Sequence, residues 1–328
     1  MYFLKNYIQS KDWIAKWYIV AKERGSNTNA LIGRKNHETN ELEEFYFCHS
    51  KHDGMGFMLD HFERNNIKLK KSLNAKFKEA PSLIKNFFKI YKGLTQVQVN
   101  KVQWIDFDIK RSQKINPQRH TIYFTESETK RIHSYLRTSK TSENAFLLKE
   151  ISNFLLPILK KESQAKWLFP INMRGNITRH DPQQNISSGI YLNFNNVETY
   201  KSIKNKIKTG FINKDHWVNW WCFHISIFLT KNIMKKISLK SSKNSFFLGS
   251  FTNMGRWTQE DIESAEDLNK YSYIVAPPGT PNYPLGIGVF TWFGRLTITI
   301  KIHPSVLADQ SKIKGFSEQI KENIINLV

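Results

Sequence analysis

The alternation of apolar and polar residues around position 50 predicts a strand, a turn and a helix in succession. Alternate residues share one face of an extended chain: Glu43, Phe45, Phe47 and His49. The apolar residues after the turn recur at helical spacing: Met55, Met58, Leu59 and Phe62. The turn itself carries His49, His52, Asp53 and Gly54. The pattern therefore ends a strand at an imidazole and begins a helix just after a carboxylate and a glycine.

These turn residues are candidates for chemistry. An imidazole titrates near neutrality, so His49 at a strand end could take a proton from a hydroxyl, amine or thiol. Asp53 can turn back and lock the loop that orients the ring. Gly54 is expected to adopt a backbone conformation that other residues resist, and to start the helix. Two alternatives stay open: a surface loop with incidental histidines, or a metal site of His49, His52 and Asp53, which lacks a partner cluster elsewhere.

The rest of the first half divides by its patterning. Residues 1–20 are expected to be helical, 24–40 a polar loop, and 98–110 a strand. The Lys-rich stretch 65–100 predicts a linker and an amphipathic helix, which would be either a solvated basic face over an apolar stripe or a helix on a membrane surface. A polar gap at 110–118 predicts a boundary between domains 1–115 and 116–328.

The second half alternates strands and helices. Expected strands cover 119–124, 167–174, 190–194 and 245–251, with a hairpin over 285–302. Expected helices start at Thr125, Ser142, near 196 and near Asp309; Thr125 with Glu128 forms a helix-start signal. The stretches 175–189, 258–270 and 276–281 are expected to be loops, a short helix or rigid turns.

Composition narrows the class of protein. The chain has 328 residues, 40% of them hydrophobic, and only 2 cysteines, which argues against a disulfide framework. The densest apolar run, 217–229, is too interrupted to span a bilayer, and the N-terminus shows no clean signal peptide, so a cytoplasmic soluble protein is expected. The net charge of +21 fits binding to nucleic acid, an anionic membrane, an acidic carrier protein or a phosphorylated cofactor. The excess of Lys over Arg also fits the compositional bias of an AT-rich genome.

The stretch from Cys48 to Gly54 resembles the H-H-x-x-x-D-G motif of the CoA-dependent acyltransferase superfamily. That superfamily includes chloramphenicol acetyltransferase, non-ribosomal peptide condensation domains, plant acyltransferases and wax ester synthase/diacylglycerol acyltransferase. Cys48 stands at the place of the first motif His. His49 stands at the place of the second, the general base in that family, and Asp53 matches its structural Asp.

Four later stretches resemble the same superfamily in the same order. They are Thr141 to Asn144 before an apolar helix, Phe169 to Arg174, Gly249 to Gly255, and Phe293 to Leu296 before a strand. The resemblance covers about residues 42–328. The region before the motif is shorter than in relatives, so some strands of the first domain are expected to be missing or rearranged.

The resemblance implies an α+β fold like that of chloramphenicol acetyltransferase: two lobes, each an α/β sandwich with a mostly antiparallel sheet, joined around a tunnel. It implies that His49 deprotonates an alcohol or amine acceptor, which attacks an acyl thioester of CoA or a carrier protein without a covalent enzyme intermediate. Thr252 and Asn253, with Ser250 in the same segment, are the expected oxyanion and tunnel residues. No tightly bound cofactor and no metal are implied.

Other residues receive structural interpretations. Arg174 is expected to form a salt bridge that fixes a loop. Four aromatic residues are expected in the core or the tunnel wall: Trp220, Trp221, Phe223 and Phe228.

Two other functions remain as alternatives. One is a catalytically inactive homologue that binds or docks, favoured by Cys48 and the short first domain. The other is a basic nucleic-acid-binding protein, although no recognised nucleic-acid motif is present and no nucleic acid is expected. The partners expected are the thioester donor, the small acceptor and, at the periphery, a membrane surface.

Overall fold

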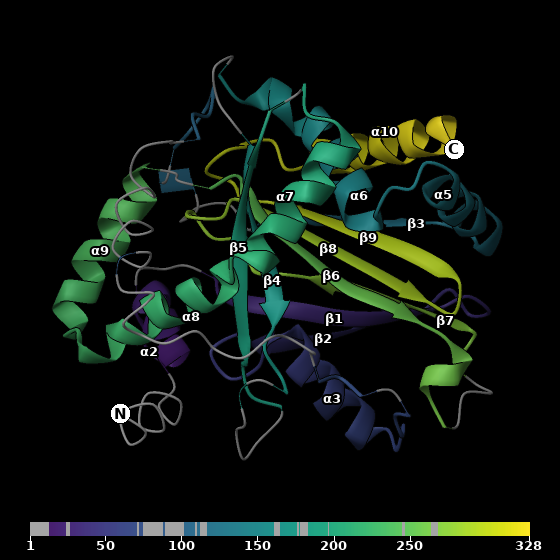
Figure 1. Ribbon diagram of the computed structural model, residues 1–328, viewed down its shortest axis with the longest axis horizontal. Helices are drawn as coiled ribbons and strands as arrows, with labels where there is room; N and C mark the ends of the chain where they lie inside the picture. Colours follow the sequence, from purple (N-terminus) through teal and green to yellow (C-terminus); the bar gives the residue numbers. More distant parts are fainter. Residues whose placement is uncertain are drawn as a thin grey trace.

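Helices and two β-sheets make up the computed structural model (Figure 1). The structure describes residues 13–23, 27–70, 72–74, 88, 102–108, 110–111, 117–160, 165–175, 177, 183–195, 197–244, 247–263 and 268–328. Within those ranges, no helix has the length and apolarity needed to cross a bilayer.

The larger sheet has six strands, which follow the order β3-β9-β8-β6-β4-β5. Their bounds are β3 Arg119–Tyr123, β4 Ala165–Asn172, β5 Ser187–Phe194, β6 Gly249–Trp257, β8 Leu285–Trp292 and β9 Arg295–Ile302. Five helices contribute to the main apolar core on one face: α5 Glu126–Thr138, α6 Glu143–Leu155, α7 Tyr200–Ile212, α8 Asp215–Ile225 and α10 Lys312–Leu327. Their apolar stripes meet Phe251, Ile287 and Ile298 of the sheet.

The smaller sheet joins the two ends of the sequence. Its strand order is β2-β1-β7, with β1 Asn29–Asn36, β2 Leu42–Cys48 and β7 Tyr271–Ala276, all antiparallel. Helix α3, Gly54–Arg64, packs on it through Met58 and Phe62 in a second apolar core. A Cβ on Gly288 of β8 would lie 1.8 Å from the Val275 carbonyl oxygen, so glycine is what lets β7 lie directly on β8.

Three further elements lie at one end of the molecule, at the left of Figure 1. They are helix α2, Trp13–Glu23, the 3₁₀ turn η3, Ser226–Phe228, and helix α9, Lys231–Asn244. Helix α2 contacts α8, η3 and α9.

The expected α+β architecture with mostly antiparallel sheets is confirmed. Five of the seven strand pairings are antiparallel, and only β4 with β6 and β6 with β8 run parallel. The hairpin over 285–302 is also confirmed, with Phe293 and Gly294 at φ of 45° and 80° in its turn. The division between 115 and 116 stays a prediction; β7 shows that the small sheet takes a strand from beyond it.

Three expectations about elements are wrong. Residues 24–40 contain strand β1, whose Ala30, Leu31 and Ile32 are buried because β1 lies between two other strands. Strand β6 does not stop at Phe251 but continues to Trp257. Residues 102–108 form no strand and make one isolated bridge, Trp104 with Leu159. The helix expected in 65–100 lies mostly outside the described residues, as does the side chain of Phe223.

Candidate active site

Asp53 begins helix α3. Its backbone is extended, at φ −86° and ψ 176°, and its Oδ1 accepts a hydrogen bond of 2.7 Å from the Gly56 N–H. This is the usual N-cap arrangement, in which a side-chain oxygen satisfies an N–H that the first helical turn leaves without a partner.

The same carboxylate binds Arg174 from β4's end of the larger sheet. Arg174 donates from Nη1 to Oδ2 at 3.0 Å and from Nη2 to Oδ1 at 2.9 Å, and the side chains are only 4% and 6% exposed. The Ile186 N–H donates to Oδ2 as well, at 2.8 Å. Four donors therefore surround the buried Asp53 carboxylate. Its role is structural, because it ties the loop from Cys48 to Gly54, called the motif loop below, to the larger sheet. The expected loop-fixing salt bridge of Arg174 is in place.

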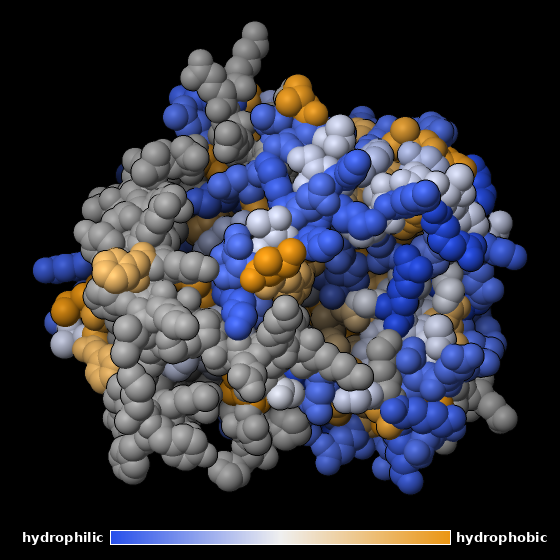
Figure 2. Space-filling view, viewed as in Figure 1, coloured by the Kyte–Doolittle hydropathy of each residue, from blue (hydrophilic) through white to orange (hydrophobic). Residues whose placement is uncertain are grey.

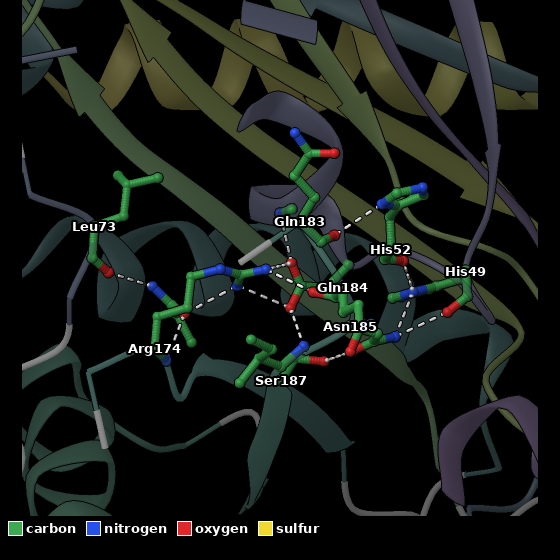
Figure 3. Close-up of polar contacts among 12 residues, drawn as sticks. His49, His52, Leu73, Arg174, Gln183, Gln184, Asn185 and Ser187 are labelled. Carbon is green, nitrogen blue, oxygen red and sulfur yellow. Dashed lines mark hydrogen bonds and ion pairs between the residues drawn. The ribbon is translucent and has the colours of Figure 1, made fainter. Parts of the chain in front are cut away.

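The chain segment 183–187, just before and at the start of β5, lies against the motif loop and binds it (Figure 3). The Asn185 N–H donates to the Lys51 carbonyl at 3.0 Å, and His52 Nδ1 lies 2.8 Å from the Gln183 carbonyl oxygen. A Cβ on Gly56 would lie 2.0 Å from that same Gln183 oxygen. Gly56, Asn185 and Ile186 escaped the sequence analysis because their roles depend on contacts between distant segments.

His49 has a defined tautomer in this loop. Its Nδ1 lies 2.9 Å from the His52 carbonyl oxygen and 3.1 Å from Asn185 Nδ2; because a carbonyl can only accept, its shorter contact favours the proton on Nδ1. Asn185 reinforces the loop by donating from Nδ2 to the His49 carbonyl at 2.8 Å, while its Oδ1 accepts from the Ser187 hydroxyl at 2.7 Å. Nε2 of His49 is then the basic nitrogen.

The His49 ring is neutral at physiological pH. Burial lowers the pKa of the imidazole, and the charge of Asp53 and hydrogen bonds with the backbone oppose that change only in part. A neutral ring with Nδ1–H held by a carbonyl can accept a proton at Nε2.

The ring of one tyrosine lies beside the imidazole. Tyr18 of α2 places its ring 5.1 Å from the His49 ring, at an angle of 31°. Burial, followed by the nearby Tyr283 and Cys48, raises the pKa of the Tyr18 hydroxyl. Burial also raises the pKa of Tyr283, to about 12, although its interaction with the Tyr191 side chain opposes that change. Sequence analysis missed these three tyrosines, which come from α2, β5 and the turn before β8.

Strand β6 separates the three expected oxyanion and tunnel residues onto two faces. Ser250 and Thr252 share a face with Met254, which packs with the small sheet and α3, on the side of the motif loop. Asn253 points the other way and donates from Nδ2 to Glu143 Oε1 at 3.0 Å and Asn144 Oδ1 at 2.7 Å. Both amide protons of Asn253 are thus used at the start of α6.

Glu143 makes the Asn253 contact a firm one. Burial raises the pKa of this carboxyl, but His133, Arg256 and Asn253 outweigh burial and bring the pKa to about 2. Two of the resembling stretches, 141–144 and 249–255, therefore meet in space through the Asn253 amide, and Arg256, the next residue after the second stretch, adds an ion pair with Glu143.

Gly54 has a different role from the one expected. Its φ is not positive, so backbone freedom does not explain it. A Cβ there would lie 3.1 Å from the Met254 sulfur, so the small residue lets α3 approach β6.

The remaining polar groups of the loop are also used by the protein. The Cys48 sulfur lies 2.9 Å from the Ser50 hydroxyl, and both motif histidines hold backbone carbonyls through Nδ1. Within the described ranges, no three His, Cys, Asp or Glu side chains gather as metal ligands do. Hollows of about 530 Å³ beside β5 and α7, and about 590 Å³ between α6 and α10, include no residue of the motif loop.

Comparison with solved structures identifies the fold. The cyclization-docking bidomain of EpoB from Sorangium cellulosum is 10% identical, with a TM-score of 0.50 over 86% of this chain and 60% of that one. The starter condensation domain of rhizomide synthetase RzmA, in complex with C8-CoA and Leu-SNAC, is 10% identical with a TM-score of 0.50 over 87% of this chain. The epimerization domain from the third module of tyrocidine synthetase B is 13% identical, with a TM-score of 0.48 over 88% of this chain and 71% of that one.

This chain spans 60% and 65% of the EpoB and RzmA chains, so it is similar to part of each. No family model matches the sequence, and no curated protein sequence does. The chain has the fold of condensation domains.

Proposed function

We propose that this chain, folded as condensation domains are, transfers an acyl group from a thioester to a hydroxyl or amine, with His49 as the general base. The observation that carries the proposal is the state of the imidazole: Nδ1–H is bound to the His52 carbonyl, and burial holds the pKa of the ring below its usual value. Both features leave Nε2 ready to accept a proton.

The steps balance with no further reagent. Nε2 takes the proton from the acceptor hydroxyl or amine as its oxygen or nitrogen attacks the thioester carbonyl carbon. The tetrahedral intermediate then collapses, the carbon–sulfur bond breaks, and the imidazolium returns the proton to the leaving thiolate. The imidazolium forms close to the Asp53 carboxylate, whose charge favours it.

The negative oxygen of the intermediate needs a hydrogen-bond donor. Thr252 and Ser250 are the candidates, because they lie on the face of β6 that is on the side of the motif loop. A single well-placed donor stabilises such a transition state by about 3 kcal/mol. Asn253 would first have to give up its bonds to Glu143 and Asn144.

The donor class follows from the chemistry and the neighbours. The RzmA condensation domain was solved with C8-CoA, an acyl thioester, and this chain carries a net charge of +21 that would attract CoA phosphates or an acidic carrier protein. We infer an acyl-CoA or an acyl carrier-protein thioester as donor, with no tightly bound cofactor.

The test compares the wild type with His49→Ala, using acetyl-CoA and octanoyl-CoA against a panel of alcohols and amines, with thiol release and product mass as readouts. His133→Ala serves as the matched control, because His133 is also a histidine but lies at the Glu143 cluster. We expect His49→Ala to lose at least about 100-fold in rate, the usual contribution of a general base, and His133→Ala to keep activity. Equal turnover by wild type and His49→Ala would refute the assignment.

A non-catalytic docking module is the second candidate. Two observations favour it: Cys48 stands where relatives have a histidine, and the Tyr18 ring lies on the imidazole. Calorimetry with octanoyl-CoA and the thiol-release assay together separate the two candidates. A docking module binds the thioester in the calorimeter, yet releases no thiol with any acceptor.

A further inference from the structure

One end of the molecule exposes apolar side chains. Twelve large hydrophobic residues are exposed in the described part of the chain, and five of them lie on α2, η3 and α9. They are Ile19 (50% exposed), Phe228 (62%), Ile233 (45%), Ile237 (44%) and Leu239 (45%). We call these five residues, together with the lysines Lys16, Lys22, Lys231, Lys235 and Lys236, the α2–α9 surface. Phe228 was expected in the core or the tunnel wall, but the structure leaves it exposed to solvent. Exposed apolar residues that gather on adjoining elements in this way indicate an interaction site.

The same surface is strongly basic. Residues 13–23 and 226–244 contain seven lysines and a single acid, Glu23. Lys231 and Lys235 of α9 both bind that carboxylate, the latter at 2.9 Å. The remaining lysines include Lys16, Lys22 and Lys236, which are exposed.

Helix α9 combines both properties on its outer arc. Met234 and Ser238 face the protein, while Ile233, Lys236 and Ile237 are exposed, with Leu239 at the far side of the arc. At the left edge of Figure 2, over α9, orange and blue side chains lie next to each other. Aliphatic side chains with lysines among them suit an interface between hydrocarbon and anionic head groups, where the ammonium group of a lysine reaches the head groups.

We propose that the α2–α9 surface binds an anionic lipid bilayer. The charge is complementary, since each lysine near an anionic membrane surface favours binding. The basic residues are all lysine, which protein–protein interfaces use less than the rest of the surface, whereas membrane-binding helices use it freely.

Helix α2 connects this surface with the imidazole. Ile19 is half exposed to solvent, and its neighbour Tyr18 lies on the His49 ring. A bilayer bound at Ile19 would therefore contact the same helix whose Tyr18 lies on the His49 ring. That placement suits a hydrophobic acyl donor or acceptor drawn from the membrane. This step rests on the proposed function, whereas membrane binding itself does not.

The experiment measures sedimentation of the full chain with vesicles, without any acyl substrate. Vesicles of phosphatidylcholine alone are compared with vesicles that contain phosphatidylglycerol. The variant carries Ile233→Asp and Ile237→Asp together. The matched control carries Val197→Asp and Ile212→Asp, which change two exposed apolar residues, 79% and 67% exposed, outside the α2–α9 surface. Both variants have the same charge, and thermal unfolding verifies that both are folded.

We expect the wild type and the control to bind the anionic vesicles, with affinity falling as salt rises. The α9 variant should bind at least about tenfold more weakly. Lys236→Glu should weaken binding by a similar factor, and Lys208→Glu on α7 should not. Absence of binding to anionic vesicles, or equal loss in variant and control, overturns the proposal. Binding of an acidic carrier protein through these residues without vesicle binding also overturns it.

Discussion

The proton on His49 decides what this residue can do. The His52 carbonyl holds it on Nδ1, and burial keeps the ring neutral by lowering its pKa. We therefore expect kcat/KM for acyl transfer to rise with pH through a single ionisation below the usual value of 6.5, and to be level from there to pH 8. A pH–rate profile with octanoyl-CoA checks this, and a rise that begins only above pH 8 would point to another base.

Asp53 is expected to matter for folding more than for chemistry. Asp53→Asn leaves the buried Arg174 without its carboxylate, and breaking such a buried pair costs about 3–5 kcal/mol. Urea unfolding measures the loss. The control is Asp60→Asn, because Asp60 pairs with Arg64, whose side chain is 75% exposed. That exposed pair should cost less than about 1 kcal/mol. Similar losses for both variants would contradict the structural role.

Single residues were predictable from the sequence where a local pattern carried the information. The strand end at His49 and the cap at Asp53 follow from alternation and helix-start chemistry within a few residues. Asn185 and Tyr18 were not predictable, because both reach His49 from distant segments; 136 positions separate Asn185 from the His49 carbonyl that it binds. Gly54 was predicted to matter for its backbone conformation, whereas its role is to let α3 approach Met254. No local rule in the sequence reveals that contact.

At the scale of elements, close approach of segments governs the site. Gly56→Ala would put a Cβ 2.0 Å from the Gln183 carbonyl, so α3 or the segment before β5 must move. We expect about 2 kcal/mol or more of destabilisation, comparable to overpacking in a core, together with lower activity. Thermal unfolding and thiol release measure the two effects.

Gly315→Ala in α10 is the control for that change. Nothing lies within 4 Å of a Cβ at Gly315, so the extra methyl group meets no atom. Alanine in a helix there should stabilise the protein by up to about 1 kcal/mol. If Gly56→Ala destabilised the protein no more than Gly315→Ala, the close packing of segment 183–187 against α3 and the motif loop would be refuted.

Elements were predictable where the sequence on both sides of a turn has the pattern of a strand, as in the hairpin of β8 and β9. Strand β1 was not, because Arg34, Lys35 and Asn36 make its second half read as a loop. Its burial comes from β2 and β7 on either side, and the partnership with β7 spans more than two hundred residues. Strand β6 was predicted to end too early for a similar reason. Thr252 and Asn253 are polar, and the Asn253 side chain binds Glu143 and Asn144, which are distant in the sequence.

The whole molecule should lose stability in mild acid. His61, His216 and His303 are buried, and burial above all lowers the pKa of each to about 4. Below pH 6.5 the unfolded chain binds protons that the folded rings refuse, so stability is present above that pH and declines toward pH 4. A shift of this size is worth on the order of 3 kcal/mol per ring.

The midpoint of thermal unfolding should therefore fall by on the order of 10 °C between pH 7 and pH 4.5. His61→Gln removes one of the rings and should reduce the fall. Equal midpoints at both pH values would show that these imidazoles take up protons without disturbing the fold.

Strand β7 has a consequence for the order of events during synthesis. The ribosome releases β1, β2 and the loop with His49 long before residues 183–187 and 271–276 exist. Until those segments emerge, the imidazole has neither its Asn185 support nor a completed sheet beneath it. A nascent chain that has not yet reached residue 276 therefore lacks the supports on which the proposed base depends.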